Sequence, residues 1–198
     1  GAPAVTPADA SGRTHALIVP VGNYRDLAIA ANGGTKGAAV FGAPIRLDLQ
    51  GRAIREIRKN AAGEYLIIAG PSAGAGLSFQ LYSWDGSANA AGLATNLRLR
   101  NADLGAFTKP ATECAAEGIG ALPASLAAGG GVQIISDCGD ADFYNDGQAA
   151  KDLQYAAWKK FRGDTVAMAP LSSVALQQQA DEQTSAQFTA TASAAGTL

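Results

Sequence analysis

The chain has 198 residues, among them 44 Ala and 24 Gly, and its formal net charge is −2. A charge this close to zero gives no electrostatic argument for binding nucleic acid or an anionic membrane. His15 is the only histidine, which excludes His-rich metal sites and mechanisms that need two imidazoles. The length fits one domain or two small ones.

Residues 1–10 show neither the basic region nor the apolar region of a signal peptide, and the chain does not begin with Met. We therefore expect a mature or processed piece. No apolar run approaches the roughly 20 residues that span a bilayer. Cys114 and Cys138 are the only cysteines; they fit one disulfide in an export compartment, or two unrelated buried thiols, but not a zinc site.

The first predicted strands lie at 16–21 and within 38–49. Pro20 places the first at a sheet edge or a strand end. In the second, Ile45, Leu47 and Leu49 alternate with charged residues, which predicts a strand with one solvent-facing side.

The next four predicted strands are the most regular, at 53–58, 64–70, 78–84 and 96–100. The segment 64–70 is continuously apolar, whereas 78–84 alternates and places Phe79 and Leu81 on one face. Four antiparallel strands within about 50 residues are typical of a β-propeller blade.

A second set of strands is predicted at 117–122, 131–137 and 161–168, with a short helix over 154–162. The segments 1–13 and 169–198 flank this region as an N-terminal extension and a tail of low charge. The tail is disordered by default, although the alternation over 187–191 could add an outer strand. The predicted fold is all-β, about two and a half four-stranded antiparallel blades of a partial β-propeller over 14–168.

Several stretches, in this order, resemble the bacterial family catalogued as domain of unknown function 3616. They are ALIVPV at 16–21, FGAPI at 41–45, LDLQGRAIR at 47–55, YLIIAGP at 65–71, LYSWDG at 81–86, EGI at 117–119, IISD at 134–137 and FR at 161–162. The resemblance covers about residues 14–168. The family name assigns no activity, so the resemblance implies a fold rather than a reaction.

Members of that family resemble exported β-propellers about twice as long as this chain, and their earlier blades have no counterpart here. The resemblance therefore implies the C-terminal half of such a protein, in the periplasm or secreted. Because an unclosed set of blades leaves open edges, we expect a second chain to complete the ring, most simply the N-terminal half of the same precursor. The other interpretation is a sequence fragment.

The acidic segment 137–147 contains Asp137, Asp140, Asp142 and Asp146. Carboxylate oxygens at such density could hold Ca²⁺ or Mg²⁺, although the spacing is not that of an EF-hand. The alternative is that these residues form solvated turns.

Glu117 and Asp137 are the candidate catalytic residues. Glu117 opens one predicted strand and Asp137 closes the next, so antiparallel pairing could bring the two carboxylates together for acid–base work or metal binding. The same pairing would bring Cys114 close to Cys138. The alternative roles are lining a channel and capping turns.

Arg52 and Arg55 are a weaker candidate for binding an anionic ligand. Three positions apart on a strand, they point to opposite faces unless a bulge intervenes. The alternative is that such arginines form ion pairs with Glu56 and Asp48 on the wet face of a sheet.

The leading hypothesis is a binding or assembly scaffold without catalytic activity. The alternative is a metal-assisted hydrolase, similar to a phosphoesterase, with carboxylates lining a propeller channel. A third hypothesis makes the tail a strand donated to a neighbouring subunit.

Overall fold

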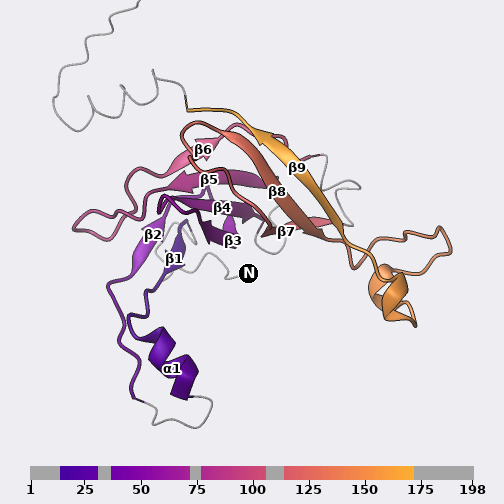
Figure 1. Cartoon of the computed structure of the whole chain (residues 1–198), viewed down its shortest axis with the longest axis horizontal. Coiled ribbons are helices and arrows are strands. Elements are labelled where there is room, and N and C mark those ends of the chain that lie inside the picture. Colours follow the sequence, from indigo (N-terminus) through magenta and orange to yellow (C-terminus); the bar gives the residue numbers. More distant parts are fainter. Residues whose placement is uncertain (1–13, 31–36, 72–76, 106–113, 172–198) are drawn as a thin grey trace, which may run out of the picture.

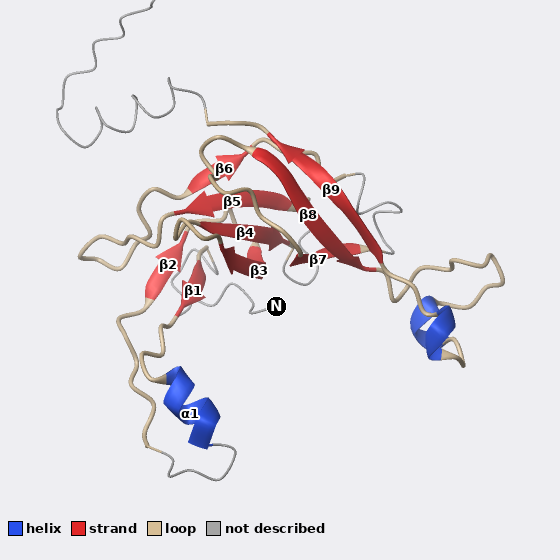
Figure 2. Cartoon of the chain, in the orientation of Figure 1, coloured by secondary structure: helices blue, strands red, loops and turns tan. Residues whose placement is uncertain are grey.

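The structure is a computed structural model, and it describes residues 14–30, 37–71, 77–105 and 114–171. Over these residues the chain forms nine strands in three antiparallel sheets, as the all-β prediction required (Figures 1 and 2). None of the three sheets is closed on itself. The predictions for residues 1–13 and for the tail beyond residue 171 lie outside the described residues.

The first sheet has two short strands, β1 (Ala16–Ile18) and β2 (Ile45–Leu47). Helix α1 (Tyr24–Ala30) lies in the connection between them, which extends away from the sheet (Figure 1). The sequence analysis missed this helix. Its local signal is Asn23, a preferred N-cap residue type, and Asn23 also holds the returning chain, because its Oδ1 accepts from Val40 N at 2.9 Å.

The second sheet follows chain order, as predicted for residues 53–100. Its strands are β3 (Ala53–Lys59), β4 (Tyr65–Gly70), β5 (Gln80–Trp84) and β6 (Arg98–Arg100). The β3–β4 turn is closed by Asn60, whose Oδ1 accepts from Glu64 N at 2.9 Å. Gly63 takes a positive φ of 90° in this turn, a conformation that favours glycine.

The third sheet contains β7 (Ala115–Ile119), β8 (Gly130–Asp137) and β9 (Arg162–Met168). A disulfide joins Cys114 to Cys138, at the shared end of β7 and β8, which confirms the expected proximity of the two cysteines. Both cysteines are buried.

The hydrophobic core lies on both faces of the second sheet. Leu66 and Ile68 of β4 pack in a cluster with residues of β7, β8 and β9. Ile67 and Ala69 pack in a second cluster with Ala16 of β1 and Leu47 of β2. The continuous apolar run of β4 is therefore explained by burial on both faces, whereas a strand with one wet face would alternate.

The short helix predicted over 154–162 is confirmed only in part, as a 3-10 helix of three residues. Only two 3-10 turns form in this region, η1 (Ala150–Asp152) and η2 (Ala156–Trp158). The Trp158 carbonyl accepts from Tyr144 Oη at 3.1 Å, and Lys159 Nζ donates to Lys151 O, outside the predicted helix, at 2.7 Å. A segment this short has little helical stability of its own.

None of the helices in the described part of the chain has the length and apolar character needed to cross a membrane.

Burial on both faces predicts a large effect of truncation in β4. Ile68→Ala should lower the free energy of unfolding by about 2–5 kcal/mol, because it leaves a cavity between two sheets. Ile68 is completely buried, while Ile135 on β8 is 37% exposed. Ile135→Ala is therefore the matched control, with an expected loss under about 1 kcal/mol. Equal losses in urea unfolding would contradict this account of the core.

Candidate functional site

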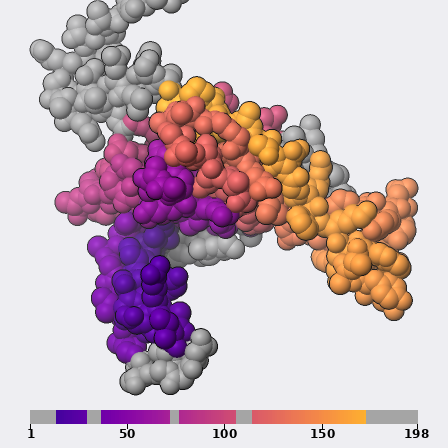
Figure 3. All heavy atoms as spheres, viewed as in Figure 1, coloured from indigo at the N-terminus to yellow at the C-terminus, as the bar shows by residue number. Residues whose placement is uncertain are grey.

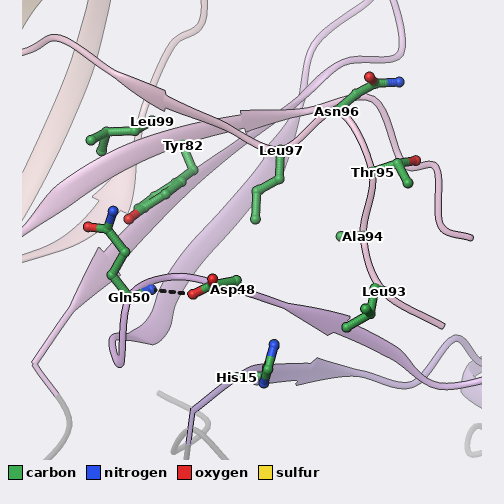
Figure 4. A pocket seen from close by; sticks show the side chains of 10 residues that line it. All are labelled: His15, Asp48, Gln50, Tyr82, Leu93, Ala94, Thr95, Asn96, Leu97 and Leu99. Atoms are coloured by element: carbon green, nitrogen blue, oxygen red, sulfur yellow. Dashed lines mark hydrogen bonds between the residues drawn. The ribbon is translucent and has the colours of Figure 1, made fainter. Parts of the chain in front are cut away.

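A cleft with polar residues in its lining lies between the β1–β2 sheet and strands β5 and β6. Its volume is about 660 Å³, within the range of small-molecule sites. Figure 4 shows His15, Asp48, Gln50, Tyr82 and Leu97 around it. The rest of the lining is formed by Leu93, Ala94, Thr95, Asn96 and Leu99.

A tight turn after β2 forms one wall of the cleft. Asp48 Oδ1 accepts from Gln50 N at 2.9 Å, and Arg52 N donates to Leu49 O at 3.2 Å. The turn places Gln50 at a φ of 55°, unusual for a residue other than glycine, followed by Gly51 at 78°. While Leu49 is buried in the core, Asp48 and Gln50 are exposed at the cleft.

The opposite wall is the connection between β5 and β6. Asp85 accepts hydrogen bonds from Ser87 and from Asn96 Nδ2, the latter at 2.8 Å, and Asn96 has a φ of 54°. Partial burial opposes ionisation of Asp85, but these hydrogen bonds outweigh it and lower the pKa of the carboxyl. Leu93 lies beside Arg46 of β2 in a parallel bridge, which ties this wall to the first sheet.

Tyr82 places its phenol at the inner end of the cleft. The residue is only 3% exposed, and its Oη donates to Gln80 Oε1 at 3.1 Å. Burial raises the pKa of Tyr82, and the charge of Arg52 only partly offsets this. The phenol therefore stays neutral at physiological pH.

His15 supplies the imidazole of the cleft, with Nδ1 2.8 Å from Thr14 Oγ1. No hydrogen bond among the described residues joins His15 to Asp48 or to Tyr82. The described residues also contain no group of three or more His, Cys, Asp or Glu side chains that could hold a metal ion. The arrangement is that of a hydrogen-bonding cleft.

The predicted acidic pair lies elsewhere, on the third sheet. Strands β7 and β8 pair as expected, but Asp137 lies opposite Ala115, and Glu117 is the extra residue of a β-bulge. The carboxylate of Asp137 accepts from Gly139 N at 2.9 Å, whereas that of Glu117 pairs with Arg55 at 2.9 Å. The two carboxylates thus have different partners.

Arg55 is also the extra residue of a bulge, in β3. The two bulges lie at matching positions in β3 and β7. Ala53 is the first paired residue of β3, and Ala115 is the first of β7. The bulge residue, Arg55 in β3 and Glu117 in β7, follows two positions later in each strand. Arg55 of the second sheet and Glu117 of the third therefore form an ion pair. Bulges re-aim side chains in this way.

The surroundings of Arg55 fix its position. Its Nη2 donates to Pro71 O at 2.6 Å, its guanidinium lies 5.9 Å from the Phe79 ring centre, and its Nε is buried without a hydrogen-bond partner. A Cβ on Gly70 would come within 2.5 Å of the Phe79 ring, so this packing requires glycine. The expected ion pair with Glu56 or Asp48 is replaced by a partner from another sheet.

Arg52 has a different environment from Arg55. It is buried, and its Nε donates to Ser78 O at 2.8 Å. The guanidinium thus supports the backbone and lies behind Tyr82 rather than lining the cleft.

The other predicted metal ligands form turns. Asp142 accepts from the N–H groups of Tyr144, Asp146 and Gly147, and Asp146 accepts from Gln148 N. Asp140 forms an exposed ion pair with Lys151. These contacts match the alternative interpretation of the segment as solvated turns.

The sequence gives no sign that His15 lies close to Asp48 or Tyr82. A lone histidine gives a weak signal, and the three residues come from distant segments. The one available signal was the turn-forming Asp-Leu-Gln-Gly stretch directly after an alternating strand.

Comparison of the chain with protein-family models, with curated proteins and with solved structures finds no match. The resemblance to domain of unknown function 3616 therefore stays a prediction, and the functional argument depends on the geometry alone.

The Arg55–Glu117 ion pair should couple the second and third sheets weakly. Both side chains are partly exposed, at 25% and 30%, so we expect a coupling energy of about 0.5–1 kcal/mol in a double-mutant cycle with Arg55→Met and Glu117→Gln. The same cycle on the exposed Lys151–Asp140 pair is the control, with no measurable coupling expected. Equal coupling energies in the two cycles would contradict the view that the bulges make the Arg55–Glu117 pair stronger than an exposed ion pair.

The Asp142 turn should depend on pH. Hydrogen bonds from Gly147 N, and then from Asp146 and Tyr144, lower the pKa of Asp142 below its ordinary value of about 3.9. The stabilisation is therefore present above that value and is lost as the pH falls through the lower folded pKa. The Gly147 amide resonance should titrate with a midpoint below 3.9, and Asp142→Asn should abolish the titration. A midpoint at or above 3.9 would contradict this assignment.

Proposed function

We propose that the chain is one half of a β-propeller and acts as a binding and assembly scaffold that a second chain completes. The observation that carries the proposal is the succession of three antiparallel sheets in which the second is covered on both faces by its neighbours. Blades of a propeller cover one another in this manner.

The contacts between the inner strands support this arrangement. The Arg55–Glu117 pair joins β3 to β7, and Arg58 Nη1 donates to Ile119 O of β7. At the far end of β3, Asn60 Nδ2 donates to Ala124 O at 3.1 Å. First strands of successive sheets that lie side by side are what a radial array of blades requires.

The outer sheets are less covered than the central one. On β8, Gln133, Ile135 and Asp137 face outward while the residues between them are buried. Within the described residues the first sheet has two strands and the third has three, so both have fewer strands than the second. A further blade on each side would cover these faces and edges.

Figure 3 shows two projecting segments, a first arm over 19–30 and 37–44 and a second arm over 139–161. Large hydrophobic side chains are exposed on both arms. Exposed patches of this kind mark interaction surfaces. The residues are Val19, Tyr24, Ile29, Val40 and Phe41 on the first arm, and Tyr144, Tyr155, Trp158 and Phe161 on the second.

The partner that fits these features is the N-terminal half of the same precursor, folded as the missing blades. The Cys114–Cys138 disulfide is compatible with an oxidising compartment such as the periplasm or the cell exterior. No observation favours the metal-assisted hydrolase, because the carboxylates proposed as Ca²⁺ or Mg²⁺ ligands bind backbone N–H groups, a lysine or an arginine.

The proposal predicts a second polypeptide in equal amount. The chain is purified from its source under native conditions, and native mass spectrometry should give a complex whose partner derives from the same precursor. Ile135→Arg on the uncovered face of β8 should abolish the complex, while the control Asp103→Asn, at an exposed residue outside both arms, should leave it intact. A monodisperse monomer of 19.9 kDa would refute the proposal.

A further inference from the structure

We infer that the cleft between the β1–β2 sheet and strands β5–β6 binds an uncharged polyhydroxylated ligand, a saccharide of one or two rings. The inference rests on the binding role of the proposed scaffold, but it does not depend on a second chain. Four features of the cleft lead to this ligand class.

The first feature is charge balance. Asp48 is the one acidic side chain in the described lining, which includes no lysine or arginine. The Arg52 guanidinium lies behind Tyr82, close enough to act on its phenol, and offsets the Asp48 carboxylate. An anionic ligand would meet a carboxylate and no cation at the surface of the cleft, and a cationic ligand would meet the field of Arg52. The balance favours a neutral ligand.

The second feature is the mixture of donors and acceptors. Oδ1 of Asp48 is occupied by Gln50 N, and no described residue donates to Oδ2. The proton of Tyr82 Oη goes to Gln80, and the Arg52 guanidinium lies close enough to share the acceptor capacity of that oxygen. The Gln50 amide N–H₂ group is a donor, as Figure 4 shows beside Tyr82. A hydroxyl both donates and accepts, so neighbouring hydroxyls satisfy such a set.

The third feature is the apolar part of the lining. Leu97 projects into the cleft between Tyr82 and Thr95 (Figure 4), and Leu99, which is 48% exposed, lies beside Tyr82. The C–H face of a sugar ring has the apolar character that these leucines would contact, while its hydroxyls reach Asp48 and Gln50.

The fourth feature is the fixed position of the polar groups. Gln50 and Asn96 are two of the three described residues other than glycine with positive φ, and they lie on opposite walls. Each is held by an aspartate, Gln50 by Asp48 and Asn96 by Asp85. Backbone of this kind gathers at ligand sites and reduces the ordering cost of binding.

The test is calorimetric titration of the chain itself with methyl glucoside, methyl galactoside, methyl mannoside, maltose and cellobiose, with glucose 6-phosphate as the anionic comparison. At least one neutral probe should bind with a Kd of about 10 mM or tighter, and glucose 6-phosphate should bind more weakly. Failure of all neutral probes to bind at about 20 mM, or tighter binding of the phosphate, would overturn the inference.

Two variants locate the binding. Asp48→Asn keeps the oxygen that accepts from Gln50 N but removes the charge, and it should weaken binding about tenfold or more. Asn tolerates a positive φ, so Gln50→Asn should leave the fold intact. The shorter side chain draws the amide group back from the cleft, so binding should weaken. Asp146→Asn, outside the cleft, is the control. Binding that neither cleft variant weakens would place the ligand elsewhere and overturn the inference.

The two proposals fail separately. Loss of saccharide binding in a chain that still forms the complex with its second polypeptide would refute the cleft assignment alone. A monomer that binds saccharide through Asp48 would refute ring completion alone.

Discussion

Burial of β4 on both faces is the constraint on which the rest of the structure depends. A strand in this position needs apolar side chains at consecutive positions, and Leu66, Ile67, Ile68 and Ala69 are all completely buried. Because they alternate between two clusters, one strand links the packing of all three sheets. Packing of the three sheets against one another then determines where β3 contacts β7. It also determines where the cleft opens between the first sheet and strands β5 and β6.

The matched bulges follow from the same arrangement. Strand β3 must pair with β4 along one edge and also contact β7 of the next sheet. An extra residue in each inner strand turns one side chain out of the regular alternation. Those residues are Arg55 and Glu117, opposite in charge, so the irregularity that would weaken each sheet becomes the contact between them. Because both side chains are partly exposed, this ion pair contributes little to stability.

Features that depend on residues close together in the sequence could be predicted. Most contacts between distant segments could not. The alternation around Phe79 and the apolar run 64–70 place strands correctly, because strand patterning depends on neighbours in sequence. Helix α1 was missed because Asn23 acts through Val40, across a long connection. The helix predicted over 154–162 forms only as the 3-10 helix Ala156–Trp158, and the Trp158 carbonyl accepts from Tyr144 Oη, which lies outside the predicted helix. The partner of Arg55 lies 62 residues away, and no local pattern indicates it.

Aspartates in turns show why composition alone locates a site poorly. Asp48 and Asp142 both accept backbone N–H groups within a few residues of themselves, and both are exposed. Asp142 uses both carboxylate oxygens on the N–H groups of its own turn. Asp48 uses one oxygen for its turn, and it lines the same cleft as Tyr82 and Leu97 of the neighbouring sheet region. The acidic segment 137–147 has the greater density of carboxylates, yet the isolated Asp48 keeps an oxygen for a ligand. Whether a carboxylate oxygen can accept from a ligand depends on which backbone N–H groups already donate to it. The fold determines those contacts.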